Sequence, residues 1–195
     1  MSWLYSIVFA GLVISSGDPV VPESCPLPIA EPMAVVAVQS DETEKFDQSY
    51  PLSANGRVNV SNVNGSIVVE AWDRNEVRLE ATKVAETKEA LANVQIKVDS
   101  RADSFSVEAD HDSWRRDRGD KGWKNYGKLE VQFKLSVPRG AVLDGVETVN
   151  GSVTVSNFVN MTKVSAVNGN VNATNLRGTA HLETVNGEVA ADFDR

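Results

Sequence analysis

An Asn-Gly dipeptide recurs at a constant interval of 18 residues near the end of this 195-residue chain. The three copies are Asn150-Gly151, Asn168-Gly169 and Asn186-Gly187. A constant interval requires every unit to adopt the same local conformation and to stack on its neighbour, because a short unit cannot bury its own apolar side chains. This repeat therefore constrains the fold more than any other feature of the sequence.

Apolar residues occupy the same offsets in every copy. Aligned at 18 residues, three sets coincide: Val146, Val164 and Leu182; Val149, Val167 and Val185; Val153, Val171 and Val189. Two architectures fit this pattern. In a β-solenoid each unit is one coil, and the strands stack about 4.8 Å apart; in an antiparallel meander each Asn-Gly is a hairpin tip. We favour the solenoid, because stacked coils require an identical register and hairpins do not.

The solenoid interpretation makes further predictions about the turns. Asn150, Asn168 and Asn186 are expected to form a ladder of side-chain amides. The turns are expected to need a positive φ, which glycine tolerates without a steric penalty and asparagine more readily than most residues. The earlier pair Asn64-Gly65 lies 86 residues before Asn150, which is not a multiple of 18, so we assign it to a separate hairpin.

Residues 41–140 predict an antiparallel β region. Alternating apolar residues indicate strands at 57–62, 66–72, 76–83, 94–100, 104–109 and 129–137. Turn-forming sequences separate the first three strands, so we expect these to form a meander. Helix-forming residues at 86–93 predict one short helix. The predicted fold class is therefore all-β, with an antiparallel sheet or sandwich that runs into 18-residue coils of a β-solenoid at 141–195.

The two ends of the chain carry their own signals. Residues 1–17 predict a signal peptide or N-terminal anchor, because an apolar run shorter than the ~20 residues of a membrane span precedes small residues suited to cleavage. Residues 18–40 hold five of the seven prolines and predict an extended linker. The strand at 189–193 is one residue shorter than its counterparts and no cap follows it, so we expect a truncated repeat array or a partner that covers the open edge.

The composition disfavours several classes of function. A net charge of -8 is unsuited to nucleic acid, which requires a basic surface. Cys25 is the only cysteine, so no internal disulfide forms, and with two histidines the chain offers no zinc cluster. The aspartates form neither an EF-hand loop nor the calcium-binding repeats of some solenoids. We therefore expect no metal, no cofactor and no catalytic residue.

One segment, at 111–128, has the chemistry of a ligand-binding loop. Its candidate contact residues are Trp114, Arg115, Arg116, Arg118, Trp123 and Tyr126. Arginines interleaved with aromatic rings can stack on sugars or bases, or pair with phosphates. The alternative is a solvated hairpin whose aromatic side chains fold back on the sheet.

The order of several short motifs resembles a known family. The motifs are GRVNV at 56–60, NGSIVV at 64–69, AWD at 71–73, EV at 76–77, LSVPRG at 135–140 and VNGSV at 149–153. Over residues 45–193 the chain resembles the bacterial domain-of-unknown-function family labelled "putative adhesin". The resemblance implies an all-β protein at the bacterial envelope, in which a sheet region runs into a β-solenoid. It supplies no catalytic residues.

Together these observations predict a non-enzymatic protein exported to the bacterial periplasm, cell envelope or surface. It would act as an adhesin or as a structural or interaction module, with a cell-surface glycan or an envelope protein as partner and membrane tethering through its N-terminus. One alternative is a glycan-processing β-helix enzyme with Asp144 and Glu147 as paired carboxylates. The other is an accessory protein of envelope-stress signalling. The pattern carries no prediction of the oligomeric state.

Overall fold

The computed structural model describes residues 41–110 and 128–194. These residues belong to one compact unit, Val38–Arg195. The predicted signal peptide at 1–17, the linker at 18–40 and the candidate contact residues between 114 and 126 lie outside the described residues. Within the described part, no helix is long and apolar enough to cross a membrane.

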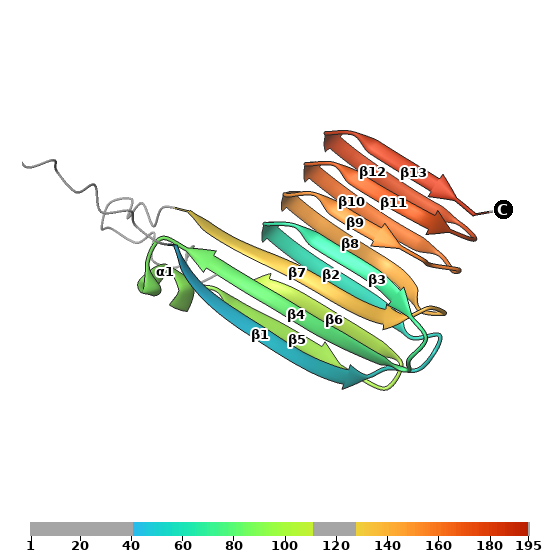
Figure 1. Cartoon of the computed structure of the whole chain (residues 1–195), viewed down its shortest axis with the longest axis horizontal. Helices are drawn as coiled ribbons and strands as arrows, with labels where there is room; N and C mark the ends of the chain where they lie inside the picture. Colours follow the sequence, from blue (N-terminus) through green and yellow to red (C-terminus); the bar gives the residue numbers. More distant parts are fainter. Residues whose placement is uncertain (1–40, 111–127, 195) are drawn as a thin grey trace, which may run out of the picture. The chain divides into compact units, whose positions relative to one another are not determined.

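The described residues form two β-sheets and one short helix (Figure 1), which confirms the predicted all-β class. In spatial order, the seven-stranded sheet contains β1 (Glu42–Pro51), β4 (Glu76–Ala85), β7 (Leu129–Pro138), β3 (Ile67–Trp72), β9 (Val153–Ser156), β11 (Val171–Leu176) and β13 (Val189–Phe193). The six-stranded sheet contains β12 (Ala180–Asn186), β10 (Thr162–Asn168), β8 (Val142–Asn150), β2 (Arg57–Asn64), β6 (Ser104–Asp110) and β5 (Gln95–Ser100). Both sheets contain strands from before and after residue 140.

The helix α1 (Lys88–Ala92) lies within the segment predicted to be helical. Thr87 caps its N-terminus, because the threonine hydroxyl accepts a hydrogen bond from the backbone N–H of Ala90 at 3.2 Å. Ala90 and Leu91 are buried.

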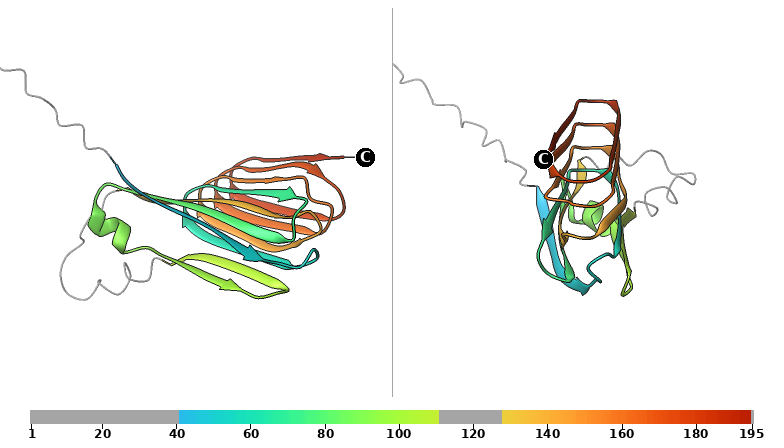
Figure 2. Two further views of the ribbon diagram at one scale, coloured as in Figure 1. Left: turned by 60° about the horizontal axis from the view of Figure 1, so that its bottom comes forward. Right: turned by 90° about the vertical axis from the view of Figure 1, so that its right-hand side faces the viewer.

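The 18-residue units lie parallel to one another and in register. The strands β8, β10 and β12 pair in parallel in the six-stranded sheet, and β9, β11 and β13 do so in the seven-stranded sheet. Val171 lies opposite both Val153 and Val189, as the aligned apolar offsets predict. Parallel pairing excludes the hairpin alternative, in which neighbouring strands would be antiparallel. Figure 2 shows the units one above another.

The assignment of Asn64-Gly65 to a separate hairpin is wrong. β2 ends at Asn64 and pairs in parallel with β8, which ends at Asn150, so that the two asparagines lie opposite each other. β3 likewise pairs in parallel with β9. The sequence interval conceals this relation because β4, α1, β5, β6 and β7 are inserted between the first unit and the second. The stack therefore contains four units.

The predicted antiparallel meander is also wrong. β2 and β3 lie in different sheets, and β7 separates β3 from β4. Antiparallel pairing occurs instead between β1 and β4, between β4 and β7, and between β5 and β6. The turn residues correctly predicted where the chain reverses, but a turn does not determine which strand becomes the neighbour. Both sheets are mixed, because each contains parallel as well as antiparallel pairs.

Alternating side chains of both sheets form one buried core. Among its largest members, Phe105, Phe133 and Phe158 are at most 1% exposed. Burial of such a side chain stabilises the fold by about 1.5–3 kcal/mol. Burial decreases towards β13, where Val189 is 43% exposed although the equivalent Val171 is fully buried.

Candidate functional site

Four Asn-Gly turns stack at one end of the two sheets. We call Asn64-Gly65, Asn150-Gly151, Asn168-Gly169 and Asn186-Gly187 rungs 1 to 4, and their four asparagine side chains the asparagine ladder. The rungs connect β2 to β3, β8 to β9, β10 to β11 and β12 to β13, at the end of the sheets where α1 also lies (left in Figure 1). Three of the four asparagines are exposed and Asn64 is half-buried.

The asparagine ladder is a continuous chain of amide hydrogen bonds. Each Nδ2 donates to the Oδ1 of the preceding rung: Asn150 to Asn64 at 2.8 Å, Asn168 to Asn150 at 3.0 Å, and Asn186 to Asn168 at 2.9 Å. The predicted ladder is therefore confirmed, and Asn64 extends it. The chain has a direction, because Nδ2 of Asn64 and Oδ1 of Asn186 have no partner among the described residues. Hydrogen-bonded amides polarise one another, so Asn64 is the positive end of the ladder.

Close approach of the stacked backbones explains the glycines better than the predicted positive φ. A Cβ on Gly151, Gly169 or Gly187 would lie 2.0–2.1 Å from the carbonyl oxygen of the glycine in the preceding rung. The φ angle is positive at Gly65 (124°), Gly151 (156°) and Gly169 (156°), but Gly187 has the same close approach without a positive φ. None of the ladder asparagines has a positive φ, so that part of the prediction is wrong.

Threonine hydroxyls donate hydrogen bonds to the backbone carbonyls of two of the rungs. Two positions before the ladder asparagines of rungs 2 and 4 stand Thr148 and Thr184, which bond to the preceding rung. Thr148 Oγ1 donates to the carbonyl of Gly65 at 3.5 Å, and Thr184 Oγ1 donates to that of Gly169 at 2.9 Å. In rung 3 this position is Ala166, which has no side-chain donor.

In rung 1 the same position is Asn62, which joins the ladder to β7. Its buried Nδ2 donates to the carbonyl oxygens of Val131 at 2.7 Å and Gly65 at 3.2 Å. Its Oδ1 accepts a hydrogen bond from the N–H of Val63 at 2.9 Å. Rung 1 is therefore held firmly against the beginning of β7.

The sequence interpretation missed a second asparagine pair, at the opposite end of the sheets. Asn175 Nδ2 donates to Asn157 Oδ1 at 2.7 Å. These two are the non-glycine residues with positive φ in the described chain, at 53° and 67°, a conformation that asparagine tolerates. Their spacing of 18 residues was the available signal. Conversely, Asn55-Gly56 has the dipeptide but lies in the turn between β1 and β2, outside the ladder.

A pocket with a mixed polar and apolar lining lies at the base of the asparagine ladder. Its volume is about 580 Å³, and rungs 1 and 2 line it together with the beginning of β7. The hydrogen-bonding side chains in its lining belong to Asn64, Ser66, Asn150, Ser152, Lys128 and Glu130. Leu129 adds a half-buried apolar side chain. The pocket therefore offers both donors and acceptors.

The structure describes only some of the candidate residues from the sequence. The residues of the predicted contact loop, Trp114, Arg115, Arg116, Arg118, Trp123 and Tyr126, lie outside the described residues. Asp144 and Glu147 are both exposed on β8, which has a bulge there, and neither lines the pocket. Within 41–110 and 128–194, no group of three or more His, Cys, Asp or Glu side chains could hold a metal ion.

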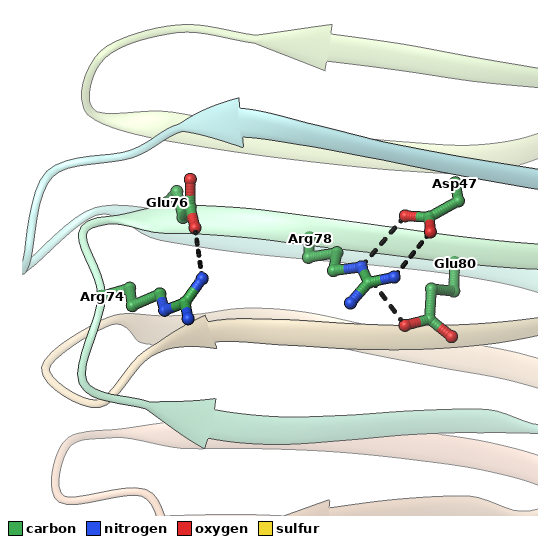
Figure 3. Close-up of polar contacts among 5 residues, drawn as sticks. All are labelled: Asp47, Arg74, Glu76, Arg78 and Glu80. Atoms are coloured by element: carbon green, nitrogen blue, oxygen red, sulfur yellow. Dashed lines mark hydrogen bonds and ion pairs between the residues drawn. The ribbon is translucent and has the colours of Figure 1, made fainter.

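Ion pairs hold β1 against β4 on an exposed face of the seven-stranded sheet (Figure 3). Arg78 donates from Nε and Nη2 to the two carboxylate oxygens of Asp47, at 3.0 and 2.6 Å, and its Nε lies 3.4 Å from Glu80. The hydrogen bonds from Arg78 lower the pKa of Asp47 from its ordinary value. Arg74 and Glu76 form a further pair at 3.4 Å. These side chains are solvent-exposed, so the pairs add little stability, and the pair between Arg78 and Asp47 mainly orients β1 on β4.

No family model matches the chain, and no curated protein matches it. Some solved structures are similar to it at low sequence identity. A putative cell adhesion protein from Clostridium sporogenes is 9% identical with a TM-score of 0.40, over 80% of this chain and 100% of that chain. A putative lipid binding protein from Parabacteroides distasonis is 13% identical with a TM-score of 0.38, over 74% of this chain and 59% of that chain. A putative adhesin from Bacteroides fragilis is 8% identical with a TM-score of 0.24, over 77% of this chain and 96% of that chain. At these identities and TM-scores the similarities carry no argument about the function of this chain.

Proposed function

We propose that this protein is a non-enzymatic interaction module of the bacterial cell envelope or surface, exported by its N-terminal segment, and that its repeats are coils of a β-solenoid. The asparagine ladder is the observation that carries this proposal. Four in-register turns present side-chain amides along one end of both sheets. The amides bond to one another, so the surface is ordered before it meets a ligand, which reduces the entropy lost on binding.

The partner is a cell-surface glycan or an envelope protein. An amide both donates and accepts hydrogen bonds, and hydroxyl or peptide groups match it without requiring a charge. The net charge of -8 disfavours an anionic partner. The two carboxylates considered for glycan hydrolysis, Asp144 and Glu147, are exposed on β8 and give that alternative no support.

Retention of the full chain on cell surfaces tests the proposal. Labelled protein, incubated with isolated bacterial envelopes and with intact bacterial and epithelial cells, should be retained in a saturable manner. Asn150→Ala interrupts the ladder and should reduce retention. Asn175→Ala is the matched control, because it breaks an asparagine pair of the same kind at the opposite end of the sheets.

Cell fractionation provides an independent readout of export. The protein, expressed with its own N-terminus, should be found in the periplasm or at the surface. A folded protein that binds none of these surfaces, or that stays in the cytosol, would contradict the proposal. If Asn150→Ala and Asn175→Ala are retained equally, the asparagine ladder is not part of the surface that contacts the partner.

A further inference from the structure

Several backbone carbonyls of the lining residues already accept a hydrogen bond between strands. The N–H of Ile67 donates to the carbonyl of Ser152 at 3.0 Å, and the N–H of Phe133 donates to that of Ser66 at 2.9 Å. The side chains of the lining are therefore the main groups that remain for a ligand.

Three side chains in or directly after rungs 1 and 2 have unused hydrogen-bonding capacity. The hydroxyls of Ser66 and Ser152 have no partner within the part of the chain that the structure describes. The Nδ2 of Asn64 is the unbonded donor end of the asparagine ladder. Each hydroxyl can both donate and accept, whereas the amide nitrogen only donates. The pocket thus needs a ligand that supplies acceptors and donors side by side.

Charge narrows the class of ligand. Lys128 and Glu130 line the pocket with one charge of each sign, 4.0 Å apart, and Asp41 lies 3.6 Å from Lys128. An anionic ligand would be repelled by the two carboxylates, which outnumber Lys128. Both carboxylates are already paired with Lys128, and the Asn64 amide nitrogen is a hydrogen-bond donor, so a cationic ligand would have to displace an ion pair. A neutral ligand avoids both costs.

An apolar ligand is also a poor match. Leu129 is the large apolar side chain among the lining residues. An apolar ligand would take the serine hydroxyls and the Asn64 amide out of water without replacing their hydrogen bonds, which is unfavourable. A neutral ligand rich in hydroxyl groups meets these requirements.

We propose that this pocket binds a neutral, polyhydroxylated sugar unit of a glycan. Adjacent hydroxyls of a sugar both donate and accept, which matches Ser66, Ser152 and Asn64, and the C–H face of the ring can contact Leu129. A volume of about 580 Å³ lies within the range of roughly 300–1,000 Å³ typical of ligand pockets. The site rests on the proposed function and adds to it a ligand class and a location.

Glycan binding by the full chain tests the class of ligand. The protein is applied to an array of neutral and acidic oligosaccharides, and the strongest neutral ligand is then titrated by calorimetry. Binding should be to neutral glycans, and the Kd should change less than about twofold between low and high salt, because screening does not weaken contacts to an uncharged ligand.

Two tyrosine variants test the location. Ser152→Tyr fills the pocket and should weaken binding at least about tenfold, or 1.4 kcal/mol. Asn170→Tyr is the matched control, because Asn170 follows Gly169 as Ser152 follows Gly151 but lies outside the pocket lining. It should change the Kd less than about twofold. Ser152→Ala, which removes only the hydroxyl, tests the same contact if the tyrosine variant does not fold.

The outcomes separate the site from the proposed function. Unchanged glycan binding by folded Ser152→Tyr would overturn the site, and retention on cell surfaces would still support an interaction module. Binding of acidic glycans alone, lost at high salt, would overturn the ligand class. Retention on envelopes without glycan binding would do the same and favour a protein partner. Failure of both retention and glycan binding would refute the proposed function and the site together.

Discussion

Replacement of Gly169 by alanine tests the close approach of the stacked backbones. The new Cβ would lie 2.0 Å from the carbonyl oxygen of Gly151, whereas ordinary contact begins at 3.4 Å. The obstructing atom belongs to the backbone, so no side-chain rotation relieves the clash. Rungs 2 and 3 would have to move apart by roughly 1.4 Å to restore ordinary contact.

A displacement of this size breaks the hydrogen bonds between rungs 2 and 3. Gly151 N–H donates to the carbonyl of Asn168 at 3.0 Å, and Val153 N–H to that of Asn170 at 2.9 Å. The amide bond from Asn168 to Asn150 measures 3.0 Å. At about 1 kcal/mol for each of these three bonds, Gly169→Ala should cost about 3 kcal/mol. For a domain of this size the expected fall in Tm is roughly 6–12 °C.

Gly145→Ala is the control without a close backbone contact. Gly187→Ala, whose Cβ would lie 2.1 Å from the carbonyl oxygen of Gly169 without a positive φ, separates the close approach from the positive φ of Gly169. A Cβ on Gly145 would meet the side-chain oxygen of Asn59 at 3.1 Å, and this amide can move slightly. Its cost should stay below about 1 kcal/mol. Urea unfolding and thermal melts of the three variants give the comparison. Equal losses of stability in Gly169→Ala and Gly145→Ala would refute the explanation of the glycines by close approach.

Four other substitutions test the ladder, the position of the threonine hydroxyls and the ion pair between Asp47 and Arg78. Asn186→Asp puts a carboxylate oxygen against the Oδ1 of Asn168 in the preceding rung and should lower the free energy of unfolding in urea by about 1–2 kcal/mol. Asn64→Asp keeps the oxygen that accepts from Asn150 and should lower it by less than about 0.5 kcal/mol. Equal losses in the two variants would contradict the direction of the ladder. Ala166→Thr supplies a hydroxyl donor to the carbonyl of Gly151 and should raise the free energy of unfolding by about 0.5–1 kcal/mol. A lower urea midpoint than that of the wild type would contradict the stabilising role of the threonine hydroxyls. Because the folded-state pKa of Asp47 is lowered, the stability that its ion pair adds is present above the ordinary pKa of 3.8 and is lost as the pH falls through the folded value. The difference in urea midpoint between wild type and Asp47→Asn should therefore shrink in acid, and a difference that is constant with pH would contradict this assignment.

Local patterns predicted most of the secondary structure. The alternation in 76–83 places Val77, Leu79 and Ala81 on one face, and all three are buried in β4. The helix at Lys88–Ala92 is found within the predicted segment. These predictions succeed because the period of the apolar side chains reflects the geometry of a single element.

The candidate site was only partly predictable. The ladder of Asn150, Asn168 and Asn186 follows from an equal spacing along the chain, and all three amides bond as expected. Asn157 and Asn175 have the same spacing, but neither is followed by a glycine that would mark a turn. The pocket had no sequence signal, because Lys128 and Ser152 meet only after β7 pairs with β3 and β3 pairs with β9.

The sequence by itself determined most of the strands, though not β1, together with the 18-residue register and the glycines of the stacked turns, because equal spacing within one continuous array gives equal positions in the fold. Only the tertiary structure decided that Asn64-Gly65 is the first rung. An insertion that runs from β4 to β7 separates this rung from the second in the chain, while hydrogen bonds between β2 and β8 join the two in space. Strand pairing depends on which backbones come together, and distance along the chain does not encode it.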